Sequence, residues 1–491
     1  MRLKHLLLAL VAQMISLTAW AQPVLVDGIR YELNWTEKTA SVCSQGNYIG
    51  EVTIPSEVSY SGLAYSVTSI DDYAFCYCYR LTSINLPESL TSIGYRAFYG
   101  CSGMTTINIP ASVTSIGNEA FYECFELTSI DIPEGVTSLG YNAFFHCEGL
   151  TSINLPESLT SIDYRAFYCC SALTSIDIPK GVTSIGGEAF QGCSGLTSIT
   201  LPKGLKSIGE WAFCDCSGVT SLNIPNSLTS LGGAAFYGCS GLTSITIPSG
   251  ITSIEPLVFT CCSGLTSISL PERVTSIGNE AFSCCSGLTS ISLPEHVRSI
   301  GEGAFQGCSG LTSITLPKGL KSIGNEAFSG CSGMTTIIIP ASVTSIGDAA
   351  FQDCSSMTEV TSYVTAPFIP SNNNLFPKQM KTSGTLYVPK GTREAYIEKG
   401  WEMYFAQIRE IGTTAVAGVN NSNGAKVQSH GDEIVVRGLD EGTPIHVYDL
   451  NGRLLTTAVA GSNETRIRVN AESTQAVVVN AGERSVKVMV K

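Results

Sequence analysis

The sequence predicts a repeat solenoid built from short parallel strands, turns and single helical turns, about thirteen repeats long, followed by a small C-terminal β-sandwich. Thirteen phenylalanines recur at a strict 23-residue period from Phe75 to Phe351, and a cysteine lies three residues after each of them, from Cys78 to Cys354. Twelve of the 20 prolines keep the same period. One period sustained without insertions is typical of stacked units, each too small to bury its own apolar face.

The repeat unit contains two short apolar stretches and a turn. One unit, starting at Leu81, reads LTSINLPESLTSIGYRAFYGCSG. Its first residues favour a strand, which Pro87 ends because proline cannot donate to a strand ladder. A second apolar stretch follows, Gly94 permits a turn, and the last apolar residues fall on one side of a single helical turn. The residues expected to face the core are Leu81, Ile84, Leu86, Leu90, Ile93, Ala97, Phe98 and Cys101.

Thirteen of the 19 cysteines belong to one ladder. Because this ladder shares a face with the phenylalanines, we interpret it as a column of buried thiols that pack as small hydrophobic groups. Disulfides are the alternative in an exported protein, and the best candidates are Cys261 and Cys284, which lie beside the ladder and are also 23 residues apart. One cysteine per repeat does not supply the closed sets of four ligands that zinc requires.

Charge and the N-terminus indicate the compartment and exclude some partners. The chain has 491 residues and a formal net charge of −13, which disfavours nucleic acid and anionic membranes as partners. A positively charged start precedes an apolar run, and Ala19-Trp20-Ala21 carries small residues at both positions that a signal peptidase reads. We predict a signal peptide cut between Ala21 and Gln22, and a secreted or outer cell-surface protein. No other apolar stretch in the sequence approaches the ~20 residues that span a bilayer, so no membrane insertion is expected after the signal is removed.

The period also sets the predicted domain boundaries. Short alternating segments before the first full repeat predict a cap, and the breakdown of the period after Cys354 predicts a second cap over the last core layer. A stretch rich in Gly, Ala, Asn and Ser indicates a linker. The predicted parts are the signal peptide (1–21), an N-terminal cap (22–62), the solenoid (63–360), a C-terminal cap (361–411), a linker (412–425) and the β-sandwich (426–491).

The repeat resembles a known family. The pattern LTSIxLPxxLTSIGxxAFxxC, over about residues 50 to 360, is similar to the leucine-rich repeats of the BspA type. This resemblance implies a leucine-rich repeat solenoid in a surface or secreted protein, with a role in adhesion to host proteins, host cells or other bacteria. It implies no catalytic residues.

The C-terminal region carries a second resemblance. Short β-rich runs separated by turn residues, with Asn451-Gly452 as a hairpin signal, predict the small β-sandwich. The stretch IHVYDLNGRLL, from Ile445 to Leu455, and SVKVMVK at the end of the chain resemble the C-terminal sorting domains of type IX secretion substrates. Such domains direct passage across the outer membrane and attachment to the cell surface. An accessory β-sandwich without a sorting role is the alternative.

The sequence offers no constellation for catalysis, so we expect neither enzymatic activity nor a cofactor. Its five histidines are isolated, and no HExxH, GxSxG or Walker-type loop is present. His146 beside Cys147 is the one formal candidate for a Cys-His pair, but Cys147 belongs to the ladder that is expected to point inward.

Aromatic residues at two further positions of the unit mark a candidate binding surface. The residue directly after the ladder phenylalanine is aromatic in four consecutive repeats. The residue three positions before the ladder phenylalanine is tyrosine in several repeats. Rings at repeat spacing suit contact with a protein or glycan through stacking and apolar burial. The alternative is that the rings only pack over the turns. The candidate ligand-binding residues are Tyr95, Tyr99, Tyr122, Tyr141, Phe145, Tyr164 and Tyr168.

These observations together predict adhesion or ligand binding through the solenoid surface, with a host or microbial surface protein or glycan as the partner. The first alternative is a structural surface stalk or spacer without a ligand of its own. The second is a glycan-binding surface protein.

Overall fold

The computed structural model describes residues 23–43, 46–370 and 374–411, together with the strands between 426 and 490 and a few residues beside them. The chain divides into two compact units, Met1–Gly412 and Thr413–Lys491. The predicted signal peptide (1–21), the predicted linker (412–425) and the turn at Asn451-Gly452 lie outside the described residues.

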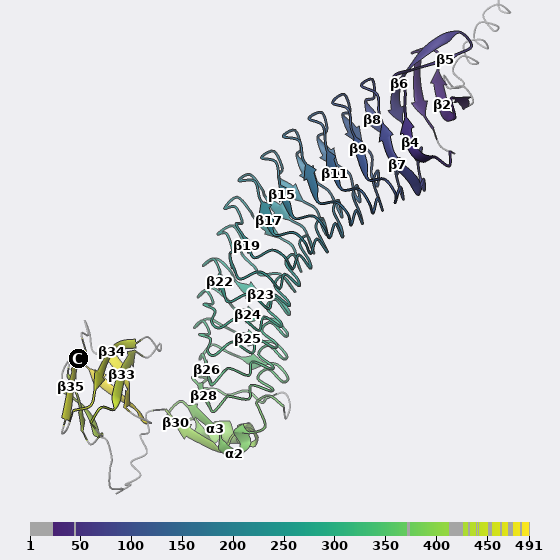
Figure 1. Cartoon of the computed structure of the whole chain (residues 1–491). Helices are drawn as coiled ribbons and strands as arrows, with labels where there is room; N and C mark the ends of the chain where they lie inside the picture. The colour runs from purple at the N-terminus through teal and green to yellow at the C-terminus, as the bar shows by residue number, and fades with distance from the viewer. Residues whose placement is uncertain are drawn as a thin grey trace, which may run out of the picture. The chain divides into compact units, whose positions relative to one another are not determined.

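A small antiparallel meander begins the first unit. β1 (Val24–Val26), β2 (Ile29–Asn34) and β3 (Thr39–Val42) pair in order, and β5 (Glu57–Tyr60) forms a hairpin with β6 (Leu63–Ile70). β3 pairs with β6 in parallel, and β6 pairs with the first short strand of the coils. The meander, at the purple end of Figure 1, therefore covers the first layer of the core.

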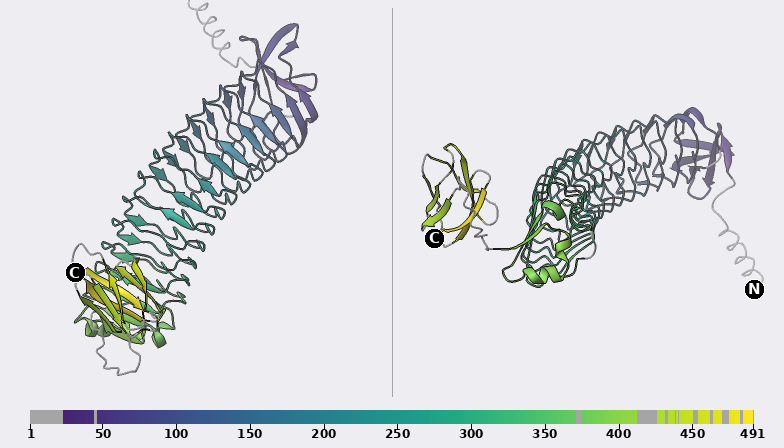
Figure 2. Two further views of the ribbon diagram at one scale, coloured as in Figure 1. Left: turned by 60° about the vertical axis from the view of Figure 1, so that its left-hand side comes forward. Right: turned by 90° about the horizontal axis from the view of Figure 1, so that it is seen from below.

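Most coils contribute two short parallel strands, which stack in a 23-residue register, as Ser129 does on Ser152. Figure 2 shows these strands side by side along the solenoid. The first row contains β4 (Ile49–Thr53), β7 (Arg80–Asn85), β9 (Thr106–Asn108), β11 (Ser129–Asp131), β13 (Ser152–Asn154), β15 (Ser175–Asp177), β17 (Ser198–Thr200), β19 (Ser221–Leu222), β21 (Ser244–Thr246), β22 (Ser267–Ser269), β26 (Thr336–Ile339) and β28 (Glu359–Ser362). The second row contains β8 (Ser92–Ile93), β10 (Ser115–Ile116), β12 (Ser138–Leu139), β14 (Ser161–Ile162), β16 (Ser184–Ile185), β18 (Ser207–Ile208), β20 (Ser230–Leu231), β23 (Ser276–Ile277), β24 (Ser299–Ile300), β25 (Ser322–Ile323) and β27 (Ser345–Ile346).

The third side of each coil, which we call the turn edge, surrounds the ladder phenylalanine. Alternate backbone N–H groups donate to the next coil, as Phe75 does to the carbonyl of Ala97 at 2.8 Å. The residues two before and two after each ladder phenylalanine have positive φ, as in Tyr73 and Tyr77, both at 60°. Where the sequence predicts one helical turn, the structure has a series of turns closed over three residues, because a left-handed residue interrupts a right-handed helix.

The ladder phenylalanines form one continuous stack inside the solenoid. Neighbouring ring centroids lie 5.2–5.7 Å apart, with ring planes within 11° of parallel. All thirteen rings are buried, which confirms the predicted core face. Phe376 extends the stack at 5.3 Å from Phe351, although it lies 25 residues further along the chain and outside the period.

The cysteine ladder lies beside this stack. Its thirteen thiols are buried, which confirms that they are part of the core. Each thiol from Cys101 onward donates to the carbonyl of the ladder phenylalanine in the preceding coil, over 3.0–3.3 Å. The first one, Cys78, donates to the carbonyl of Gly46 at 3.3 Å. The thiols therefore link coils directionally as well as filling space.

An aromatic cap ends the first unit. β29 (Thr385–Val388) and β30 (Gln407–Glu410) extend the first row beyond β28, with α2 (Met380–Ser383), α3 (Arg393–Glu398) and the short 3₁₀ helix η1 (Trp401–Met403) around them. Trp401, Tyr404 and Phe405 contact Phe376, the last ring of the stack. The last core layer is thereby covered.

The second unit consists of two antiparallel sheets, compatible with the predicted β-sandwich. One sheet contains β31 (Lys426–His430), β32 (Glu433–Arg437) and β35 (Glu464–Arg468). The other contains β34 (Leu454–Val459), β33 (Pro444–Asp449), β36 (Gln475–Ala481) and β37 (Arg484–Val490). Ile434 and Val447 belong to a hydrophobic cluster separate from that of the solenoid, so each unit has its own core.

Candidate functional site

Aromatic side chains gather on the turn edge of the first five coils. In this segment Phe98 is buried in the core, whereas the next residue, Tyr99, lies at the surface and is half-buried. We call the set the aromatic band. It comprises Tyr73, Tyr77, Tyr79, Tyr95, Tyr99, Tyr122, Phe125, Tyr141, Phe145, Tyr164 and Tyr168.

Four rings of the band stack on one another at coil spacing. Tyr99 and Tyr122 lie 4.5 Å apart between ring centroids, Tyr122 and Phe145 4.5 Å, and Phe145 and Tyr168 4.7 Å, with planes within 10° of parallel. The two inner rings are therefore covered on both faces, and the surface presents ring edges and hydroxyl groups. Burial raises the pKa of Tyr99, Tyr122 and Tyr168, so these hydroxyls stay protonated donors at physiological pH.

The three predicted tyrosines on the other side of the ladder make side-chain hydrogen bonds instead of stacking on one another. Tyr95 and Tyr141 flank a coil that carries Asn118 at the equivalent position, and hydrogen bonds to Glu119 and Tyr95 raise the pKa of Tyr141. Tyr164 donates its hydroxyl to Glu188 at 2.5 Å and is exposed. The structure thus brings the predicted residues onto one edge, where four of them form a stack and the other three lie beside it.

Two arginines lie among the rings of the band. The Arg96 guanidinium lies 5.0 Å from the ring centroid of Tyr95 and 4.9 Å from that of Tyr99, and it forms an ion pair of 2.6 Å with Glu119. Arg165, three coils later, repeats the arrangement with Tyr164, Tyr168 and an ion pair of 2.8 Å to Glu188. Because each cation has its own carboxylate, the band is polar and aromatic without a surplus of charge at these two positions.

Sequence reasoning missed the most exposed rings of the band. Tyr73, Tyr77 and Tyr79 are 41%, 51% and 58% exposed, and Phe125 is 39% exposed. Tyr73 and Tyr77 pack edge-on against Tyr95 and Tyr99, so they extend the band toward the N-terminal meander. The signal was present in the first repeat, YAFCYCY, but its tyrosines occupy different positions of the unit from those compared along the chain.

On the other two sides of the coil, threonine hydroxyls donate hydrogen bonds to carbonyls of the preceding coil. Thr128 donates its hydroxyl to the carbonyl of Thr105 at 3.2 Å, and Thr91 donates to Thr68 at 3.0 Å. The pattern repeats along both rows. These threonine ladders recur from coil to coil, whereas the aromatic band is confined to one part of the solenoid.

Of the remaining candidate groups, His146 packs against the band at its edge, with its ring centroid 4.6 Å from that of Phe145 and 5.7 Å from that of Tyr168. His146 contacts Glu148 at 3.0 Å on the surface, whereas the thiol of Cys147 is buried against the carbonyl of Phe121. Within the described ranges no group of three or more His, Cys, Asp or Glu side chains is placed to hold a metal ion. Cys261 and Cys284 lie in side-chain contact on the turn edge.

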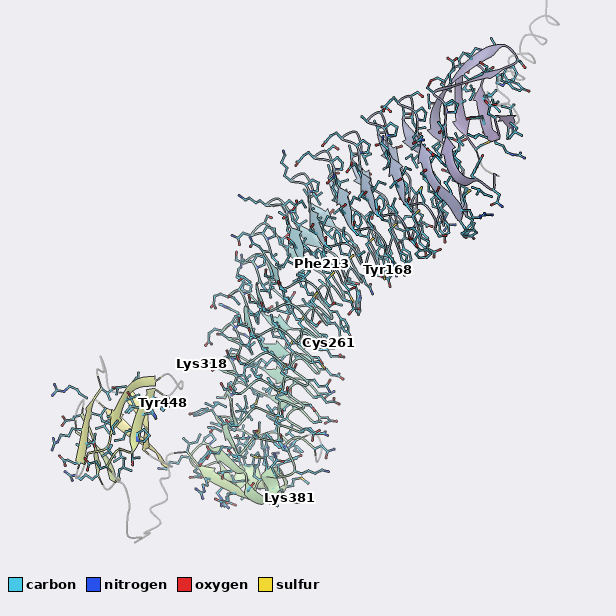
Figure 3. The ribbon with its side chains drawn as sticks, viewed as in Figure 1. Tyr168, Phe213, Cys261, Lys318, Lys381 and Tyr448 are labelled. Carbon is cyan, nitrogen blue, oxygen red and sulfur yellow. The ribbon has the colours of Figure 1, made fainter. Side chains whose placement is uncertain are left out.

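Figure 3 gives the position of the turn edge on the solenoid. Tyr168 and Cys261 lie along one edge, and Lys318 lies on the opposite edge. In the part of the chain that the structure describes, no helix is long and apolar enough to cross a membrane.

Comparison with known families gives a match to the "BspA type Leucine rich repeat region" over residues 68–197, 183–290 and 275–376. A solved leucine-rich repeat protein from Bacteroides ovatus is 33% identical, with 69% of this chain and 94% of that chain covered and a TM-score of 0.59. A leucine rich cell surface protein from Faecalibacterium prausnitzii is 31% identical, with 70% of this chain and 95% of that chain covered and a TM-score of 0.47. Comparison with curated proteins gives no match.

Proposed function

The chain belongs to the BspA-type leucine-rich repeat family, and from this premise we propose that it is an exported surface protein that binds a protein ligand through the aromatic band. The observation that carries the proposal is the uneven distribution of rings. Five aromatic side chains of the first coils are more than a third exposed, whereas from residue 238 to 362 the only aromatics are ladder phenylalanines. Exposed tyrosines beside arginines are the composition of protein-binding hot spots.

The geometry of the stack favours a protein over a glycan as the ligand. A sugar ring that binds by stacking needs an uncovered aromatic face, and the faces of Tyr122 and Phe145 are occupied by their neighbours. Ring edges and protonated hydroxyls instead suit apolar contact combined with hydrogen bonds, which is how tyrosine contributes to protein interfaces. Glycan binding is the alternative, and a glycan array tests it.

An export route and a surface location accompany this proposal. The predicted signal peptide, with its cut between Ala21 and Gln22, supports export, and the name of the related Faecalibacterium protein places that protein at the cell surface. For the second unit we propose a sorting and attachment role, which rests on the resemblance of its sequence to type IX sorting domains.

Binding by the solenoid alone separates this proposal from the stalk. Residues 23–411 contain a complete hydrophobic core of their own, so this fragment is expected to fold without the second unit. Surface plasmon resonance against a panel of immobilised extracellular matrix proteins, with a glycan array in parallel, should give the fragment the same Kd for at least one protein as the full chain. Binding that disappears with the second unit would favour the stalk, and binding confined to glycans would favour the second alternative.

A further inference from the structure

One row of the turn edge brings side chains of adjacent coils unusually close. This outer row is the position two residues after each ladder phenylalanine, and all thirteen of its residues have positive φ. Glycine, which tolerates this conformation best, occupies five of the positions. The backbones are hydrogen-bonded between coils here, as in the N–H of Cys261 donating to the carbonyl of Ser283 at 2.8 Å.

The distance between neighbouring side chains of the outer row follows from placing a Cβ atom on one of its glycines. A Cβ placed on Gly192 would lie 3.7 Å from the Cβ of Cys169 and 2.8 Å from its Sγ. A disulfide requires two Cβ atoms about 3.5–4.5 Å apart. Two cysteines at consecutive positions of this row therefore have the separation that a disulfide needs.

Cys261 and Cys284 occupy two consecutive positions of the outer row. Both have left-handed backbones, with φ of 60° and 59°, where a glycine would be less strained. Their thiols lie close enough to interact with each other. Cys284 is exposed and Cys261 is partly exposed, whereas the ladder thiols beside them, Cys262 and Cys285, are buried against phenylalanine carbonyls.

The pair lies where the strand ladders are interrupted. In the second row β20 ends one sheet and β23 begins the next, and Ile254 in the coil between them forms an isolated bridge with Ile277. In the first row β22 ends a sheet, and the next pairing within the described residues is the isolated bridge of Ser292 with Thr315. A covalent link between these coils would therefore reinforce the solenoid beside one of the gaps in its first-row ladder.

We propose that Cys261 and Cys284 form a disulfide that joins two adjacent coils when the protein meets a low-molecular-weight disulfide. The thiolate of Cys284, the more exposed residue, attacks one sulfur of the donor and releases one donor thiol. The thiolate of Cys261 then attacks the sulfur of Cys284 in the mixed disulfide and releases the second donor thiol. The two cysteines are oxidised, the donor disulfide is reduced to two thiols, and the two cysteine protons end on those thiols.

The test is to treat the full chain with oxidised glutathione, alkylate it in denaturant without reductant, and analyse its peptides by mass spectrometry. Two of the 19 thiols should disappear, and one linked peptide pair should join Cys261 to Cys284. Cys261→Ser and Cys284→Ser should each abolish the linked pair. Cys169→Ser is the matched control, because Cys169 lies in the same row but faces Gly192 in the next coil, and this variant should still form the pair.

Three results would overturn the proposal. They are retention of all 19 thiols, a glutathione adduct on Cys284 that never resolves into a linked pair, and a linked pair that persists in Cys261→Ser. Circular dichroism of each variant confirms that the fold is intact, since both cysteines are at the surface.

Discussion

At the scale of single residues, the coil depends on left-handed positions filled by ordinary amino acids. Arg96, Glu119 and Trp211 have φ of 54°, 56° and 57° two residues before their ladder phenylalanines. Side chains with a Cβ are strained in this conformation by about 1 kcal/mol. Hydrogen bonds between coils offset this strain, because the left-handed positions let alternate N–H groups reach the next coil while Phe and Cys point inward.

Adjacent alanines in the last coil test this strain. Ala349 has a φ of 55°, whereas Ala350 does not have a positive φ, and both are buried. Ala349→Gly should leave the free energy of unfolding unchanged or raise it by up to about 1 kcal/mol, because glycine relieves the strain. Ala350→Gly, the matched control, should lower it by about 1–2 kcal/mol through lost packing and added chain entropy. Urea unfolding measures both, and equal destabilisation by the two changes would contradict the interpretation.

At the scale of elements, the ladders explain how strands of two or three residues are stable. The phenylalanine stack and the row of thiols run through every coil, and each thiol from Cys101 onward is hydrogen-bonded to the coil before it. Burial raises the pKa of Cys239, Cys285 and Cys354 from 9.0 to about 12. The other ladder thiols shift in the same direction, so the whole ladder is held protonated.

The ladder should make the solenoid sensitive to alkali. Between pH 9 and 12 an unfolded chain releases these protons while the folded chain keeps them, so stability is complete below pH 9 and falls as pH rises. Each such thiol lowers the free energy of unfolding by ~1.4 kcal/mol for every pH unit in this window. Far-ultraviolet circular dichroism should therefore show cooperative unfolding above pH 9. The Cys284→Ser control should unfold at the same pH because that thiol is exposed, and a native spectrum at pH 12 would contradict the prediction.

At the scale of the whole molecule, the sequence predicted those features that repeat with the 23-residue period. The stacked coils, the buried ladder from Phe75 to Phe351 and the aromatic edge all follow from residues that recur every 23 positions. Features that break the period were not predicted. Phe376 joins the stack through the fold of the cap, and the exposed tyrosines of the first coil occupy their own positions. The orientation of the rings could not be predicted from the sequence either, because spacing alone does not say whether ring faces or ring edges meet the solvent.

The most direct test of the binding surface compares two variants of the full chain. Tyr77→Ser with Tyr79→Ser removes the two most exposed rings of the band without touching the core, and Lys318→Ser with Lys321→Ser is the control, with exposed residues of the later coils. Kd is measured by surface plasmon resonance for the matrix protein that the panel identifies. The aromatic band as ligand site predicts at least tenfold weaker binding, about 1.4 kcal/mol, for the tyrosine variant and unchanged binding for the control. Equal Kd for wild type and the tyrosine variant would contradict it.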